Sequence, residues 1–264
     1  MMSEQTSLRV DNVLKLAALI IWRNVFRFFP VALAVMVPQA LYRLALSQDL
    51  FSADHILLDT LMLSGAAAIG VISPALVEIL LVYAILQALN EHVVSLRLSI
   101  AWAKPRILSA IVIVLLLECW LFLLPTSFGD FGTSGLLAVS LVELGLWLCV
   151  ATFFSVAIPT LMVEECGLFD CLRRSIYLTD GFRWQIFAIW LVVILIISGI
   201  EYLFISIKLS LMDGFLMTAG QSFANLVELS IFALFAAVVS VVIYSKLRNI
   251  KDGPRAESVA TVFD

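Results

Sequence analysis

The sequence predicts an all-α polytopic membrane protein, a bundle of six transmembrane helices with short amphipathic helices at the membrane surface. Three observations support this fold class: the composition, the number of long apolar stretches and the distribution of bases. The chain is 62% hydrophobic and only 14% charged, whereas soluble domains are about a quarter charged. So few polar side chains cannot cover the apolar surface of a soluble fold of this size. Lipid is therefore the expected solvent.

Six stretches are apolar and long enough to cross a bilayer, whose core of about 30 Å needs about 20 helical residues. Their apolar runs do not alternate with polar residues, so helices are favoured over the strands of a membrane barrel. Pro74 and Pro159 lie within the second and fourth stretches, where each removes one helical hydrogen bond. The expected spans are Phe28–Leu46, Leu61–Leu89, Ile107–Leu124, Leu136–Val163, Trp184–Phe204 and Phe223–Tyr244.

The bases alternate between the connections of these spans. Of the 16 Lys and Arg residues, 14 fall in the N-terminal arm, the second and fourth connections and the C-terminal tail, and only Arg43 and Lys208 fall on the other side. Loops rich in Lys and Arg stay in the cytoplasm. We therefore expect both termini in the cytoplasm, an even number of spans, and a single membrane domain over residues 1–250 followed by a flexible tail over 251–264.

A basic segment precedes each outward span, which is compatible with three copies of a two-span unit. Arg27, Arg106 and Arg183 stand at the three entries, 79 and 77 residues apart. The alternative is that any six-span protein with basic inner loops shows such a period. The segment Cys166–Asp180 is the clearest case, because Phe169, Leu172 and Ile176 fall on one helical face.

Such basic helices beside a span commonly lie in the headgroup plane, with their bases toward anionic lipid. The alternative is a cytoplasmic helix packed on its own loops. Under the lipid hypothesis, eight bases contact lipid headgroups or a partner protein. They are Arg23, Arg27, Arg97, Lys104, Arg106, Arg173, Arg174 and Arg183.

Five glutamates fall within the expected spans with no base at comparable depth. A carboxylate inside a bilayer is costly and usually faces the bundle interior or water. One interpretation is a polar path for a cation, a proton or a headgroup, with Glu78 as the deepest member. The other is that the glutamates lie near the interface, or are protonated and hydrogen-bonded to neighbours. The five are Glu78, Glu118, Glu143, Glu201 and Glu228.

Other chemistry is not indicated. The four cysteines, in no CxxC pair, are expected to be apolar packing residues, and with two histidines they predict no metal site. Nucleophile–base sets, phosphate-binding loops and HExxH patterns are absent, so we expect no enzyme, no cofactor and no nucleic-acid partner. A cleavable signal peptide is not expected, because the first apolar stretch begins only near Phe28.

The segment from Val163 to Trp184 resembles a known family. Its Glu-Glu-Cys-Gly start, Leu172-Arg173-Arg174-Ser175 core and following Leu-Thr are similar to the signature loop of bacterial six-span proteins related to the membrane domain of glycerophosphoryl diester phosphodiesterases. The tail from Tyr244 to Gly253 resembles the same family. Cys171 and Asp180 depart from its pattern. The chain lacks the His, Glu and Asp motifs of the catalytic domain, so the resemblance implies no hydrolase activity.

The resemblance implies instead a stand-alone protein of the bacterial inner membrane, connected with lipid metabolism or envelope maintenance. Together with the basic segments, it favours a non-enzymatic protein that engages membrane lipids, anionic ones above all, or a partner protein or a second copy of itself. The alternative function is a small transporter or channel that uses the intramembrane glutamates.

Overall fold

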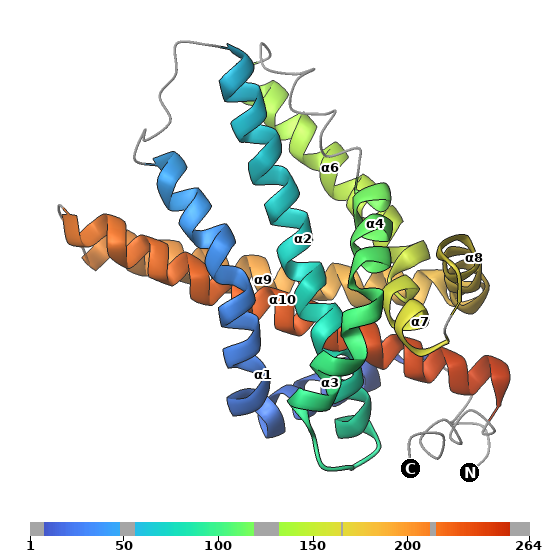
Figure 1. Cartoon of the computed structure of the whole chain (residues 1–264). Helices are drawn as coiled ribbons and strands as arrows, with labels where there is room; N and C mark the ends of the chain where they lie inside the picture. The colour runs from blue at the N-terminus through green and yellow to red at the C-terminus, as the bar shows by residue number, and fades with distance from the viewer. Residues whose placement is uncertain (1–7, 48–55, 119–131, 165, 212–214, 254–264) are drawn as a thin grey trace.

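The computed structural model describes residues 8–47, 56–118, 132–164, 166–211 and 215–253, and all regular structure in these ranges is helical (Figure 1). The long helices are α1 (Val10–Ser47), α2 (Ile56–Leu89), α6 (Gly132–Phe154), α9 (Arg183–Leu211) and α10 (Phe215–Asp252). The shorter ones are α3 (Leu96–Ala103), the 3₁₀ turn η1 (Lys104–Arg106), α4 (Ile107–Leu117), α7 (Ala157–Val163) and α8 (Leu168–Thr179).

Within these ranges, six stretches of helix are long and apolar enough to cross a membrane. They are Val10–Ala45, Ser64–Leu89, Leu96–Leu117, Leu141–Val163, Arg183–Leu203 and Phe223–Asp252. This confirms the predicted all-α polytopic fold class. The first and third stretches begin earlier than expected, because helix continues through the basic segments that precede them. The expected end of the third span, at residue 124, lies outside the described residues.

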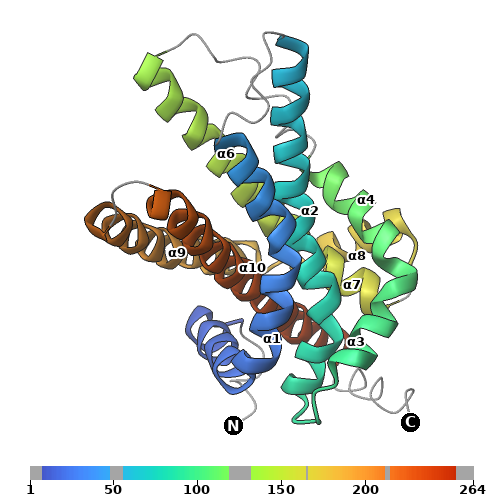
Figure 2. The ribbon, with the colours of Figure 1, turned by 60° about the vertical axis from the view of Figure 1, so that its left-hand side comes forward.

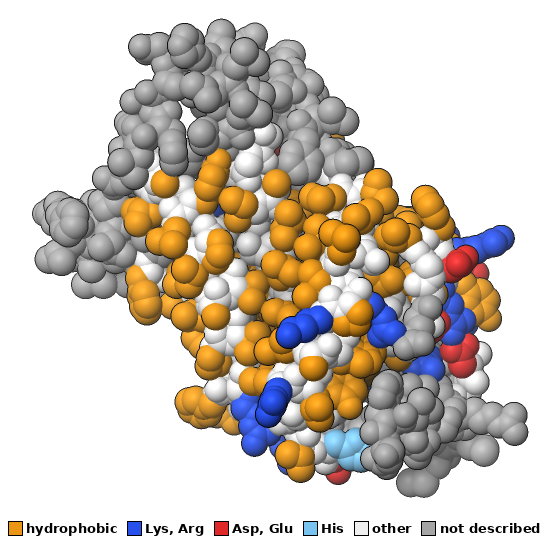
Figure 3. Space-filling model, in the orientation of Figure 1, with side chains coloured by type: hydrophobic (Ala, Val, Ile, Leu, Met, Phe, Trp, Pro, Cys, Tyr) orange, Lys and Arg blue, Asp and Glu red, His pale blue; other side chains and the backbone are white. Residues whose placement is uncertain are grey.

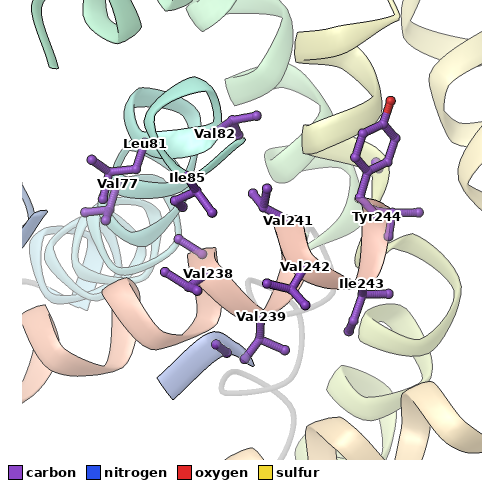
Figure 4. Packing of buried hydrophobic residues seen from close by; sticks show 14 of the residues in the cluster. Val77, Leu81, Val82, Ile85, Val238, Val239, Val241, Val242, Ile243 and Tyr244 are labelled. Carbon is purple, nitrogen blue, oxygen red and sulfur yellow. The ribbon is translucent and has the colours of Figure 1, made fainter. Parts of the chain in front are cut away.

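The core forms where α1, α2 and α10 pack against one another, and these three helices make the most extensive contacts in the described chain. Figure 4 shows the contact between α2 and α10, where Ile85 of α2 points toward the buried Val238 and Val241 of α10. Small residues let the helices approach closely: Ala233, Ala237 and Ser240 of α10 are buried. The small-residue spacing of the last span thus marks a packing face.

The fourth predicted span is broken where its proline disturbs the helix. α6 ends at Phe154, α7 begins at Ala157, and Pro159 lies in the first turn of α7. Proline has no N–H, so the carbonyl of Ser155, four residues earlier, has no helical donor. Pro74 lies inside the continuous α2 and likewise leaves the Gly70 carbonyl, four residues earlier, without a helical donor. Each proline therefore frees one backbone acceptor inside the bundle.

The elements expected on the basic side lie together at one end of the molecule. The first part of α1, the α2–α3 turn, α8 and the C-terminal end of α10 lie toward the lower and right-hand side of Figure 1. Figure 2 shows the same first part of α1 and α3 at the lower end. Lys and Arg side chains gather on this part of the surface, and a broad apolar surface adjoins it (Figure 3). We call this part of the molecule the basic end.

Candidate functional site

Two of the five glutamates that were predicted to lie within the membrane line one cavity. The cavity has a volume of about 280 Å³ and lies between α2, α4, α6, α9 and α10. Glu78 comes from α2, and Glu118 follows directly after α4. Glu143, Glu201 and Glu228 are not among the lining residues, and Glu201 is exposed. The structure therefore brings Glu78 and Glu118 to a common space, and a path through all five stays a prediction.

The cavity lining is mainly apolar and aromatic. Trp147 and Trp190 form an edge-to-face pair there, with ring centroids 5.4 Å apart and an interplanar angle of 89°. Phe154 and Phe232 contribute further rings. Such a lining with a few polar groups is typical of a small-molecule site. No Lys or Arg is among the lining residues that the structure describes.

Ser240 connects α10 with α2 and with the junction between α6 and α7 at this cavity. Its hydroxyl on α10 lies within hydrogen-bonding distance of both Glu78 Oε1 on α2 and the Ser155 carbonyl oxygen between α6 and α7. That carbonyl is the one that Pro159 leaves without a helical donor. A hydroxyl donates only one proton. Both contacts are hydrogen bonds when Glu78 carries a proton and donates to Ser240, while Ser240 donates to Ser155.

Three buried polar atoms in cavity-lining residues have no hydrogen-bond partner among the described residues. They are Glu118 Oε2, Ser155 Oγ and Trp190 Nε1. Such atoms are uncommon in folded proteins, because an unsatisfied buried polar group costs about 1–3 kcal/mol. Their gathering around one cavity distinguishes it from an ordinary packing gap.

At the basic end, Arg174 of α8 is held in a cluster of side chains rather than facing outward. It donates through Nε to Glu164 Oε2 at 2.8 Å, and its Nη2 contacts Asp252 of α10. The Tyr244 hydroxyl donates to Glu164 Oε1 at 3.0 Å. Burial lowers the pKa of Arg174, but the hydrogen bonds and charges of Glu164 and Asp252 outweigh it, so that this pKa is raised. We call these four residues the Arg174 cluster.

Two further predicted contact bases are also engaged by the protein. Arg106 donates to the Met162 carbonyl at 2.7 Å and stacks over Trp102 at 5.0 Å. Arg183 pairs with Asp180 at 3.3 Å and lies over the ring of Phe153. These arginines join neighbouring elements.

The remaining five predicted contact bases are exposed. They are Arg23 and Arg27 on α1, Arg97 and Lys104 around α3, and Arg173 on α8. Bulky aromatic side chains accompany them at the basic end. Four such rings are 79–94% exposed: Trp22, Phe26, Phe169 and Trp184.

The outward face of α8 carries apolar and charged side chains together. The buried residues of α8 are Cys171, Ser175, Leu178 and Thr179, whereas Phe169 and Ile176 are exposed beside Asp170 and Arg173. A helix that faced water would place such apolar residues inward. An aromatic and aliphatic face that also carries a base suits the membrane interface.

Cys166 and Cys171 form a disulfide with a Cα–Cα distance of 5.6 Å, so the expectation that all four cysteines are unpaired packing residues was wrong for these two. Gly167 is the N-cap of α8, which places Cys166 just before the cap and Cys171 at the fourth helical position. These two positions meet in the hydrophobic staple of helix N-termini. The disulfide is a covalent form of that contact. Cys149 is free and exposed, and Cys119 lies outside the described residues.

Comparison with known proteins adds no relative: no family model, no curated protein and no solved structure matches the chain. The resemblance to the membrane domain of glycerophosphoryl diester phosphodiesterases therefore stays a prediction. In the Leu172–Ser175 segment that carries the resemblance, Arg173 is exposed and Arg174 belongs to the Arg174 cluster. The Ser175 hydroxyl donates to the Phe153 carbonyl at 2.9 Å.

Proposed function

We propose that this multi-pass membrane protein engages anionic membrane lipids through its basic end and catalyses no reaction there. We place it in the bacterial inner membrane with both termini in the cytoplasm, and connect it with lipid metabolism or envelope maintenance. A partner protein that presents acidic groups is the alternative occupant of the same surface.

The observation that carries this proposal is the pairing of exposed rings with exposed bases. Trp22 and Phe26 alternate with Arg23 and Arg27 on one stretch of α1. Phe169 precedes Arg173 by one helical turn on α8. Aromatic rings prefer the headgroup level, and bases beside them attract anionic lipids by about 1 kcal/mol each. Five exposed bases therefore contribute several kcal/mol together.

Neutralising the exposed bases is expected to reduce retention of anionic lipid. The variant replaces Arg23, Arg27, Arg97, Lys104 and Arg173 with Gln and leaves the Arg174 cluster intact. We expect the ratio of phosphatidylglycerol to phosphatidylethanolamine that copurifies with the protein, measured by mass spectrometry, to fall at least tenfold.

The control for that experiment is Arg43→Gln, which removes an exposed base at the other end of α1 and should leave the ratio unchanged. An unchanged ratio in the fivefold variant, with the protein still folded, would exclude anionic lipid as the ligand of the basic end. Copurification of a protein that the fivefold variant alone releases would favour the partner alternative.

The disulfide and the base distribution argue for opposite orientations. Disulfides persist in oxidising compartments, whereas the basic end is expected in the reducing cytoplasm. We follow the bases, because their distribution involves every connection. In intact cells, we expect a membrane-impermeant maleimide to leave Cys166 and Cys171 unlabelled even after a cell-impermeant reductant, and to label them once the membrane is opened under reducing conditions. Labelling in reductant-treated intact cells would reverse the topology.

The alternative function, a small transporter or channel, is favoured by one observation, that Glu78 and Glu118 share a cavity. Proton- or cation-dependent flux in proteoliposomes is its direct measurement, and absence of flux in the wild-type protein excludes it.

A further inference from the structure

We propose that the cavity between α2, α4, α6, α9 and α10 binds a small amphiphilic amine, with its ammonium group beside Glu118 and its apolar part among the aromatic side chains. This site is separate from the basic end and uses none of its bases. Four features of the cavity support the assignment: its size, its charge, the different situations of its two carboxyl groups, and the tryptophan pair.

The size and lining select an apolar ligand body. The cavity volume of about 280 Å³ is roughly twice that of an engineered cavity of about 150 Å³ that holds benzene. Val114, Val150 and Phe154 are among its apolar lining residues. A chain or ring system of about ten carbon atoms suits this space, and a longer lipid tail would have to extend beyond it.

The charge of the lining selects a cationic head group. Two carboxyl groups line the cavity, and no Lys or Arg of the described ranges lines it. An anionic ligand would therefore meet only like charges or neutral acids. A carboxylate removed from water is stabilised by a cation at close range. We therefore expect a ligand to supply the positive charge that would pair with a carboxylate of the cavity.

The two carboxyl groups are not equivalent. Glu78 Oε1 lies against the Ser240 hydroxyl, and both contacts of that hydroxyl are hydrogen bonds when Glu78 is neutral. Glu118 makes no such contact within the described residues, and its buried Oε2 has no hydrogen-bond partner among them. Glu118 is therefore the carboxyl group that we expect to pair with an ammonium group. Glu78 instead links α2 to α10 through Ser240.

The tryptophan pair favours the same class of ligand. Trp147 and Trp190 line the cavity together with Glu118. Indole rings attract ammonium groups through their π faces, and aromatic side chains next to a carboxylate are a recurring site for amines. Trp190 is 4% exposed, and its Nε1 has no acceptor among the described residues. A polar substituent next to the amine would satisfy that donor.

The test uses the full-length protein in nanodiscs of phosphatidylcholine, with decylamine as the probe and decanol and decanoate as matched probes of the same chain length. Calorimetric titration, corrected with empty nanodiscs, should show one saturable site for decylamine at pH 7. We expect decanol to bind at least tenfold more weakly and decanoate to show no saturable binding. Glu118→Gln should weaken decylamine binding at least tenfold, and Glu143→Gln, outside the cavity, should leave it unchanged.

A second variant guards against a folding defect in Glu118→Gln. Val150→Phe keeps both carboxyl groups but fills part of the cavity, and should also abolish saturable binding. Equal binding of decylamine and decanol, or full binding by Glu118→Gln, would overturn the ammonium assignment. Absence of saturable decylamine binding to the folded wild-type protein would overturn the site.

Discussion

Replacing Phe28 with alanine is expected to lower the free energy of unfolding by about 2–3 kcal/mol. The Phe28 side chain on α1 is 0% exposed and belongs to the core that α1, α2 and α10 share. In a bilayer, lipid is as apolar as the core, so burial from water contributes little. The expected loss comes from the space that the missing ring leaves between packed helices.

The matched control for that substitution lies two residues away. Phe26 is 94% exposed on the same helix, so Phe26→Ala should change the free energy of unfolding by less than about 0.5 kcal/mol. Reversible unfolding in mixed micelles, titrated with a denaturing detergent, measures both variants. Equal effects of the two alanines would show that α1 does not pack through the face that carries Phe28.

Replacing Arg174 with glutamine is expected to destabilise the protein by about 2–3 kcal/mol, because it leaves Glu164 and Asp252 without their cation. The side chains of Arg174, Glu164 and Asp252 are 26%, 18% and 30% exposed, so solvent screens the cluster only in part. The substitution also removes one of the links between α8 and the end of α10, and leaves the hydrogen bond from Lys251 to the Tyr177 carbonyl. The effect should therefore appear first as local release of the last turns of α10.

The neighbouring Arg173 provides the control for Arg174. Both substitutions remove one positive charge from α8, but Arg173 is exposed, so Arg173→Gln should cost less than about 0.5 kcal/mol. Unfolding in mixed micelles gives the global difference, and limited proteolysis near residue 252 reports the local release. A larger effect of Arg173→Gln would reverse the roles assigned to the two arginines.

The helical fold could be predicted because each span is indicated by its own run of apolar residues, without regard to contacts elsewhere in the chain. A run such as Ile107–Leu117 has no alternative to a membrane helix, whatever it packs against. The helix starts were less certain, since Val10–Arg27 combines bases with apolar residues and its continuation into α1 depends on packing. The apolar spacing of Cys166–Asp180 predicted a helix where α8 is found. It did not give the buried face, which Cys171 and Ser175 occupy.

The roles of individual charged residues could not be predicted, because they depend on partners far away in the chain. Asp252 lies 78 residues after Arg174, and Ser240 lies 162 residues after Glu78. Nothing near these residues in the sequence indicates such contacts. Two other features could have been predicted from residues that are close together in the sequence. The spacing of Cys166 and Cys171 fits the two positions of a helix staple, and Pro159 predicts a free carbonyl at Ser155.

The mutual packing of α1, α2 and α10 has a consequence for biosynthesis. The ribosome makes α1 and α2 well before α10, so these two helices are synthesised before their main neighbour exists. Val13, Phe28 and Val77 are 0% exposed in the finished fold, yet during translation they face lipid or a membrane chaperone. Contacts between such distant parts of a chain form slowly and leave intermediates exposed. The packing of α1 and α2 is therefore completed only once α10 has been made and closes on them.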